Sequence, residues 1–182
     1  ATFVRQLDQG IVADWFVYSE GAGMPPSFAE EAAALPEVAT VTTFREGRMR
    51  IGGDTATVIA PPAEGLEDTM SFRSVQGSVS PIPADGLLVA KGTAEERGLS
   101  VGSTVDVLFP VGGVRPLRVT GVFDSPAPLG DWMIAKDLFR QAFPPEAQVD
   151  LYGGITVRPG TDPAAAAAAL ERVAAPYPEL VL

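Results

Sequence analysis

The side chains that could carry out acid–base or nucleophilic chemistry in this chain are carboxylates, hydroxyls, Lys and Arg, because its 182 residues include no His and no Cys. This composition excludes a Ser-His-Asp or Cys-His nucleophilic site. It also excludes a zinc site with Cys and His ligands. Chemistry would therefore depend on carboxylates that face each other across a cleft, as they do in glycosidases.

The adjacent carboxylates of the chain form three pairs on predicted helices: Glu30/Glu31, Glu67/Asp68 and Glu95/Glu96. Neighbours on a helix point about 100° apart, so the two members of a pair do not face a common substrate. Solvated helix surface explains these pairs. Three further carboxylates lie beside predicted strands or loops, where turn formation or capping explains them: Asp14, Asp124 and Asp131.

Motifs for cofactors and metals are missing from the sequence. The glycine sets match neither a dinucleotide-binding loop nor a nucleoside-triphosphate loop, and no Asp-rich loop of the calcium-binding kind occurs. Lys91 follows an apolar run, but no Ser-x-x-Lys pattern supports an activated Ser. The sequence therefore predicts a protein that is not an enzyme, with no catalytic residue, no cofactor and no bound metal.

The charge of the chain is acidic, with 13 Lys and Arg against 23 Asp and Glu and a formal net charge of −10. The basic residues are scattered singly, which argues against a nucleic-acid groove and against an anionic membrane surface. Hydrophobic residues make up 46% of the chain, enough for a packed core. No run approaches the roughly 20 apolar residues that span a bilayer.

Residues 1–60 are predicted to form a short helix at 2–9 and then a β-α-β-β-β series. The helix of this series is expected to begin with a capping box, Ser27 with Glu30, and to end at Pro36. The glycines at 52 and 53 predict a hairpin turn between the last two strands. The predicted strands are 10–19, 38–44, 48–51 and 55–60.

Residues 61–148 are predicted to be rich in strands, with a helix over 93–97 that ends at Gly98. Residues 149–182 are predicted to form β-α-β, with Asp162 capping the helix. Because β-α-β units need partner strands to bury their faces, the two chain ends are expected to combine. The predicted fold is α+β, with one α/β lobe from 1–60 and 149–182 and an inserted β-rich lobe from 61–148.

Apolar side chains in predicted loops are the remaining candidates for a functional surface. They fall into three sets, represented by Met24 and Phe28, by Met70 and Phe72, and by Leu129 and Trp132. Exposed apolar patches mark partner or cargo surfaces. The alternative interpretation is that these side chains pack at the junction of the two lobes.

Five phrases occur in one order along most of the chain: "ADWFVYS", "AALPEVATVT", "LLVAKGTAEERGLSVGSTVDVLF", "LRVTGVFDSP" and "ITVRPGTDPAAAAAALERV". Together they resemble the extracytoplasmic domain of bacterial ABC-transporter permeases of the FtsX/MacB type, the MacB-like periplasmic core domain. Two positions depart from the family pattern, Glu37 where Gly is common and Ser103 where Asp is common. The abundance of Ala, Gly, Pro and Arg suits actinobacterial members.

The resemblance implies a porter-like lobe built from both ends, an inserted lobe, and a position outside the cell membrane between the first two transmembrane helices. It implies that a separate cytoplasmic subunit hydrolyses ATP and that the domain moves with the membrane helices to which it is joined. A second permease copy, a hydrophobic or lipid-linked cargo, and an extracellular protein are the other partners it implies. Both ends of the sequence also look cut, which predicts a piece of a longer protein.

Two other hypotheses remain open from the sequence. One is a free-standing secreted or wall-associated domain that binds a peptide or glycan through its loop aromatics. The other is a carboxylate hydrolase, which requires two carboxylates within catalytic reach in a cleft.

Overall fold

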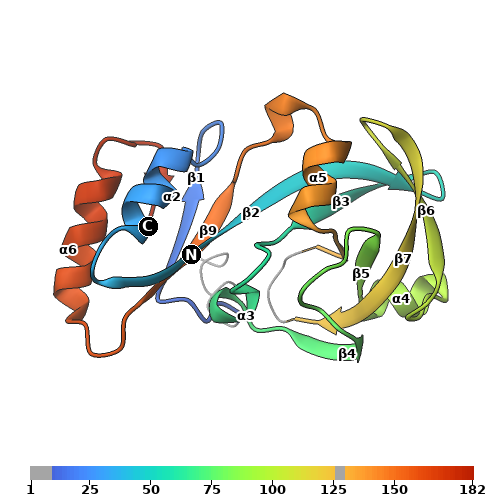
Figure 1. Cartoon of the computed structure of the whole chain (residues 1–182), viewed down its shortest axis with the longest axis horizontal. Coiled ribbons are helices and arrows are strands. Elements are labelled where there is room, and N and C mark those ends of the chain that lie inside the picture. Colours follow the sequence, from blue (N-terminus) through green and yellow to red (C-terminus); the bar gives the residue numbers. More distant parts are fainter. Residues whose placement is uncertain (1–9, 126–129) are drawn as a thin grey trace.

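A computed structural model describes residues 10–125 and 130–182 (Figure 1). Its strands are β1 (Trp15–Ser19), β2 (Val38–Ile51), β3 (Asp54–Ala60), β4 (Arg73–Gly77), β5 (Gly86–Ala90), β6 (Thr104–Phe109), β7 (Gly113–Asp124), β8 (Trp132–Met133), β9 (Tyr152–Val157) and β10 (Leu180–Val181). Its helices are α2 (Pro26–Ala33), α3 (Leu66–Thr69), α4 (Lys91–Arg97), α5 (Lys136–Ala142), the 3-10 turn η1 (Pro145–Ala147) and α6 (Pro163–Ala174). The predicted α+β class is confirmed. The predicted helix at 2–9 lies outside the described residues.

Strands from both ends of the chain form one sheet, with the order β10-β1-β9-β2. Every neighbouring pair in this sheet is antiparallel. The helices α2 and α6 lie together at one end of the molecule (Figure 1). They pack on the sheet through a core that includes Phe28, Ile155 and Leu170. The prediction that the two chain ends combine is therefore confirmed.

Five of the remaining strands close into a ring of six together with β2. In this ring β2 pairs with β3, β3 with β8, β8 with β5, β5 with β7, β7 with β6, and β6 with β2. The strand β4 pairs with the last part of β7 outside this ring. Closure removes most exposed strand edges. A large buried core lies within the ring and under α4 and α5, and it includes Met49, Val89, Val107, Trp132 and Phe139.

One strand, β2, belongs to both parts. Residues 38–44 pair with β9, whereas residues 45–51 pair with β3. The prediction of two separate strands at 38–44 and 48–51 is wrong, because the polar segment between them continues the strand. Gly47 has a packing role in this segment, since a Cβ there would overlap the ring of Phe143.

Strand pairing also bears on the predicted lobe boundaries. The hairpin of residues 45–60 pairs with β6 and β8, which come from the predicted insertion. Pairing therefore changes at residues 44 and 45, rather than at residue 60. The division of the chain into two lobes stays an interpretation.

Local turn and capping signals were predicted well. Gly52 and Gly53 have φ values of 60° and 93° and join β2 to β3, as expected of a two-residue hairpin. Gly98 has a φ of 63° and ends α4. The carboxylate of Asp162 accepts hydrogen bonds from the backbone N–H groups of the first turn of α6.

The predicted capping box at Ser27 is wrong. The helix α2 begins at Pro26, so its N-cap is Pro25, two residues before the predicted cap, and Pro25 makes no side-chain capping bond. Proline at the first helical position has its φ fixed near the helical value and has no N–H that would need an acceptor. The hydroxyl of Ser27 instead lies 2.7 Å from the hydroxyl of Tyr177, beyond α6.

Candidate functional site

A cluster of charged and polar side chains lies at the midpoint of β2, where its pairing changes. Asp150, just before β9, is its centre. The carboxylate of Asp150 accepts hydrogen bonds from Arg45 Nε at 3.1 Å, Lys136 Nζ at 3.1 Å and Thr43 Oγ1 at 2.9 Å. Lys136 Nζ also lies 2.8 Å from Thr43 Oγ1. We call Thr43, Arg45, Lys136 and Asp150 the junction cluster.

The junction cluster joins three elements that are distant in sequence. Thr43 and Arg45 point to the same face of β2, because side chains alternate along a strand. Lys136 is the first residue of α5. Gln148 extends the cluster, since it accepts a hydrogen bond from Arg45 at 2.7 Å and donates one to the carbonyl of Phe143 at 3.0 Å. The cluster therefore ties the ring and α5 to the strand that leads into β9.

The junction cluster is partly withdrawn from water. The side chains of Arg45 and Lys136 are 21% exposed, and that of Asp150 is 19% exposed. Burial lowers the pKa of Lys136, although the nearby Asp150 carboxylate opposes this shift. Burial acts to raise the pKa of Asp150, but the Lys136 ammonium, the Thr43 hydroxyl and Arg45 outweigh it and hold that pKa below its ordinary value. Asp150 is thus a charged carboxylate whose two oxygens accept hydrogen bonds from three donors.

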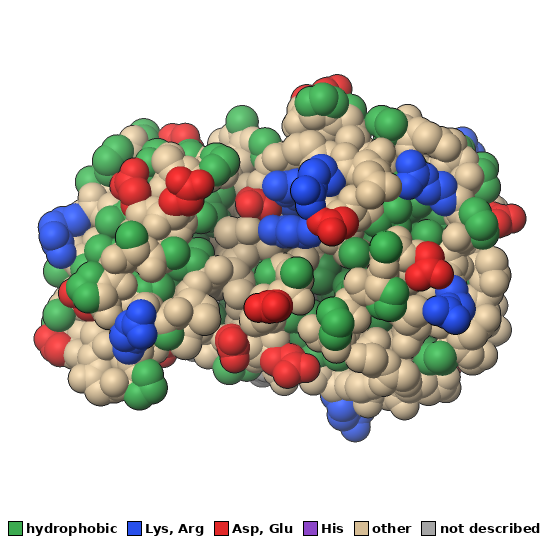
Figure 2. Space-filling model, in the orientation of Figure 1, with side chains coloured by type: hydrophobic (Ala, Val, Ile, Leu, Met, Phe, Trp, Pro, Cys, Tyr) green, Lys and Arg blue, Asp and Glu red, His purple; other side chains and the backbone are tan. Residues whose placement is uncertain are grey.

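The surface above the junction cluster is basic. Figure 2 shows Lys and Arg side chains gathered over α5 and the middle of β2, with acidic side chains next to them. Two cations and one anion make up the charged part of the cluster. Because its only carboxylate is engaged by three donors, the cluster resembles a structural clamp more than an acid–base site.

An aromatic stack lies on the opposite face of β2. The ring of Phe44 stacks on Tyr152 with centroids 5.2 Å apart, and Phe16 contacts Tyr152 at 5.8 Å. Burial, aided by the charge of Glu46, raises the pKa of Tyr152 far above its ordinary value, so this phenol stays neutral. The midpoint of β2 is therefore held by charge on one face and by ring packing on the other.

The predicted apolar contact residues do not form one surface. Met24 and Phe28 lie in the core beneath α2 and α6, Trp132 in the ring core, and Met70 in a third core cluster between them. These four side chains are at most 4% exposed. Phe72 is half-buried against Phe123, with ring centroids 5.6 Å apart.

Leu129 lies outside the described residues. The alternative interpretation placed these side chains at the junction of the two lobes, whereas the described ones lie in or against three separate core clusters. Their contact with a partner or cargo stays a prediction. The four core positions present almost no exposed surface for such a contact.

Three other residues singled out from the sequence, Asp14, Asp124 and Lys91, have structural partners. The carboxylate of Asp14 accepts a hydrogen bond from the backbone N–H of Val157 at 2.8 Å. Asp124 pairs with Arg73, and Lys91 lies 4.0 Å from Glu95 on the surface of α4. Within residues 10–125 and 130–182, no three acidic side chains group as a metal site would require.

The junction cluster itself was missed by the sequence analysis. The available signal was the pair of charged residues in the middle of a strand, Arg45 and Glu46, together with Lys136 directly after an apolar run. Arg45 and Asp150 are 105 positions apart, so no local pattern links them.

Solved structures of similar fold come from transporter proteins. The chain is similar to the periplasmic region of MacB from Actinobacillus actinomycetemcomitans, with a TM-score of 0.66 and 11% identity over 98% of this chain and 90% of that one. It is also similar to the extracellular domain of the noncanonic ABC-type transporter YknZ from Gram-positive bacteria, with a TM-score of 0.63 and 14% identity over 94% and 97% of the two chains. No curated protein matches the chain significantly.

The fold is that of the extracytoplasmic domains of ABC-type transporter permeases. In the described part of the chain, no helix has the length and apolarity needed to cross a membrane. The profile of the MacB-like periplasmic core domain matches residues 1–173, and the chain belongs to that family. Members of this class are the periplasmic or extracellular parts of membrane permeases, which favours the permease hypothesis over a free-standing binding domain.

Proposed function

We propose that this domain is a non-catalytic lever of a cell-membrane permease, which carries motion of the membrane helices to a site outside the membrane. A separate cytoplasmic subunit would bind and hydrolyse ATP. The movement would release or export a cargo, such as a hydrophobic or lipid-linked molecule, or activate an extracellular protein. A second permease copy would complete the transporter.

The observation that carries this proposal is the single strand β2 running through both parts of the molecule. Its 14 residues, at about 3.3 Å each, span about 45 Å. The junction cluster and the aromatic stack hold its midpoint on opposite faces. A continuous, clamped strand favours rigid-body transmission over bending at a hinge.

The path of the chain supports the same proposal. β1 and β10 are antiparallel neighbours, with Tyr18 opposite Val181. The chain therefore enters this sheet through β1 and leaves it through β10 at the same end. Two tethers at one end of a rigid lobe would tilt the whole domain when the membrane helices move relative to each other.

The test is a distance measurement in the full-length permease, assembled with its ATP-binding subunit in lipid nanodiscs. This chain has no Cys, so single-Cys spin labels can be introduced at exposed Glu171 on α6 and exposed Val114 on β7. We expect the distance between these labels to stay unchanged between the nucleotide-free and ATP-trapped states. The distance from Val114 to a label in the ATP-binding subunit should change.

A hydrolysis-deficient ATP-binding subunit without nucleotide is the control. A change in the distance between Glu171 and Val114 would contradict rigid transmission. A fixed distance from Val114 to the ATP-binding subunit in all states would contradict nucleotide-driven movement of the domain.

A further inference from the structure

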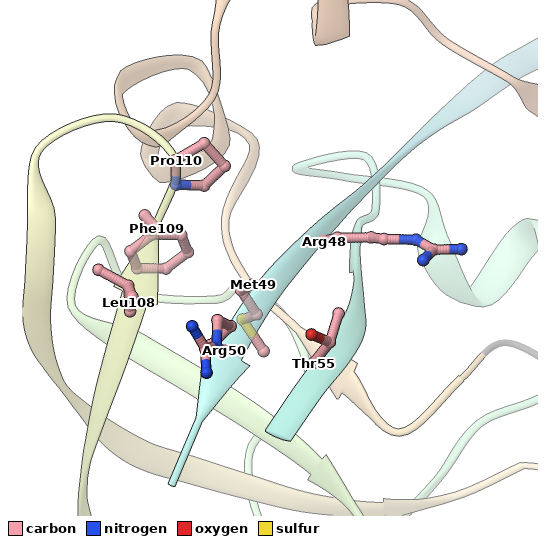
Figure 3. A pocket seen from close by; sticks show the side chains of 7 residues that line it. All are labelled: Arg48, Met49, Arg50, Thr55, Leu108, Phe109 and Pro110. Atoms are coloured by element: carbon pink, nitrogen blue, oxygen red, sulfur yellow. The ribbon is translucent and has the colours of Figure 1, made fainter. Parts of the chain in front are cut away.

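A cleft opens on the surface of the strand ring where β6 separates from β2 (Figure 3). These two strands share only two residue pairs, Arg50 with Leu108 and Ile51 with Val107. Beyond them the two backbones diverge and leave a space of about 320 Å³. This volume is at the lower end of the range, roughly 300 to 1,000 Å³, that ligand pockets occupy.

One edge of β2 is free at this cleft. Pairing with β9 stops at Phe44, and pairing with β6 starts at Arg50. Between them, residues 45–49 have a strand neighbour only on the β3 side, as far as the described residues extend. The ring of Phe143 packs on the core-facing side of Gly47 and Met49 is 1% exposed. The accessible residue of this edge is therefore Arg48, which lines the cleft.

The apolar part of the cleft continues onto an exposed patch. Phe109 and Met49, which are 3% and 1% exposed, form its floor. Leu108, at its rim, is 39% exposed and lies opposite Val114, which is 62% exposed. Val111, in the turn between β6 and β7, is 41% exposed. Exposed aliphatic side chains grouped in this way mark a contact surface more often than a solvated one.

The charged part of the cleft is cationic. In Figure 3 the side chain of Arg50 lies between β6 and β3, while Arg48 extends to the side away from Phe109. Arg50 donates to the carbonyl of Gly53 at 3.1 Å. Within residues 10–125 and 130–182, neither Arg48 nor Arg50 has a carboxylate in salt-bridge range. The nearby Asp54 is paired with Arg97 at 3.0 Å.

We propose that this cleft binds an extended acidic segment of a partner protein. The segment would place carboxylates on Arg48 and Arg50, and an apolar side chain between Leu108 and Phe109. Its backbone would run along the free edge of β2, as peptides do when they add a strand to an exposed sheet edge. Two arginines without carboxylate partners in the described part of the chain select locally for a negatively charged ligand.

A second copy of this chain is the less favourable occupant, because two molecules of charge −10 repel each other. The proposal goes beyond the lever function and does not depend on it. Peptide binding is measured on this chain alone, whereas movement of the domain is measured in the assembled permease. A negative result in one experiment therefore does not affect the other proposal.

The experiment is an NMR titration of the uniformly nitrogen-15-labelled chain with a short acetylated peptide of alternating Glu and Leu. The matched probe has Lys in place of Glu. We expect amide shifts at Arg50, Thr55, Leu108 and Phe109, with a Kd below about 1 mM for the acidic peptide. Binding should weaken as salt is raised, because the arginines are exposed and their charge is screened.

Two charge-reversal variants test the location of binding. Arg50→Glu should weaken binding at least about tenfold, whereas Arg172→Glu on α6, with the same change in net charge, should change it less than about twofold. Both side chains are exposed, so both variants should unfold at the wild-type urea concentration.

Three results would overturn the proposal. They are no shifts with the acidic peptide up to about 1 mM, equal binding of the Lys peptide, and equal weakening by the two variants. Concentration-dependent dimerisation of the chain, abolished by Val114→Glu, would identify a second copy as the occupant and would also overturn it.

Discussion

Removal of the Asp150 carboxylate is the sharpest test of the clamp at the midpoint of β2. In Asp150→Ala, Arg45 and Lys136 keep their charges and their burial but lose their only carboxylate partner within the described residues. The hydroxyl of Thr43 loses an acceptor at the same time. Truncation of one partner in a fully buried ion pair costs about 3 to 5 kcal/mol, mainly because an uncompensated charge stays buried.

The expected cost here is at the lower end of that range. The three charged side chains are 19 to 21% exposed, so water screens the two remaining cations in part. We expect Asp150→Ala to lower the free energy of unfolding by about 3 kcal/mol. For a domain of this size, that corresponds to a fall in Tm of about 6 to 12 °C.

The assay is urea unfolding at pH 7, followed by circular dichroism and tryptophan fluorescence. Asp137→Ala is the matched control, because it removes a carboxylate that is 74% exposed and that pairs with Arg140 on the surface of α5. It should cost less than about 0.5 kcal/mol. In the double variant Asp150→Ala with Lys136→Met, about 1 kcal/mol or more of the loss should be recovered, since one unpaired charge is gone.

The reasoning would be refuted if Asp150→Ala cost no more than Asp137→Ala. It would also be refuted if Lys136→Met made the Asp150→Ala protein still less stable, because the buried ammonium would then not be the source of the cost.

Three further predictions follow from the same structure. The depressed pKa of Asp150 contributes stability that is fully present above the ordinary pKa of 3.8 and is lost as pH falls through the lower pKa of the folded state. In urea unfolding from pH 6 to pH 2, the free energy of unfolding should therefore fall less in Asp150→Asn than in the wild type. Gly47→Ala places a Cβ 2.8 Å from Phe143 Cζ and should cost about 2 kcal/mol, while Gly92→Ala, with no atom within 4 Å of its Cβ, should be neutral or stabilising in the same measurement. Asp162→Ala removes the cap of α6 and should cost about 1 kcal/mol in urea unfolding, with Asp162→Asn restoring most of it.

Local features of the fold were predictable because their causes are contained within a few residues. The turn at Gly52 and Gly53 needs positive φ values, which glycine adopts freely. The ends of α4 and α6 follow from Gly98 and Asp162 in the same way. The N-cap of α2 was misplaced by two residues. Ser27 suits a cap, but Pro26 takes the first helical position, and the Ser27 hydroxyl lies beside that of Tyr177 instead.

Long-range features were predictable only in outline. The combination of the two chain ends was expected, because β-α-β ends need partner strands, but the specific pairing of β1 with β9 and β10 was not. The continuity of β2 was not, since Arg45, Glu46 and Gly47 suggest a break in a strand. The sheet on one side and the ring on the other supply partners for the whole length of β2, and Phe143 occupies the space that Gly47 leaves.

The sequence by itself determined the α+β class, the hairpin turn at Gly52 and Gly53, the end of α4, the cap of α6 and the family, because these depend on residue type and on neighbours along the chain. Only the tertiary structure decided that Arg45 and Lys136 share the carboxylate of Asp150, and that Arg48 and Arg50 border an apolar cleft. Arg45 lies 105 positions from Asp150 and Lys136 lies 14 positions from it. Charges at such separations meet only where the pairing of β2 with β9 and the packing of α5 bring them together, and no periodic pattern along the chain encodes that meeting.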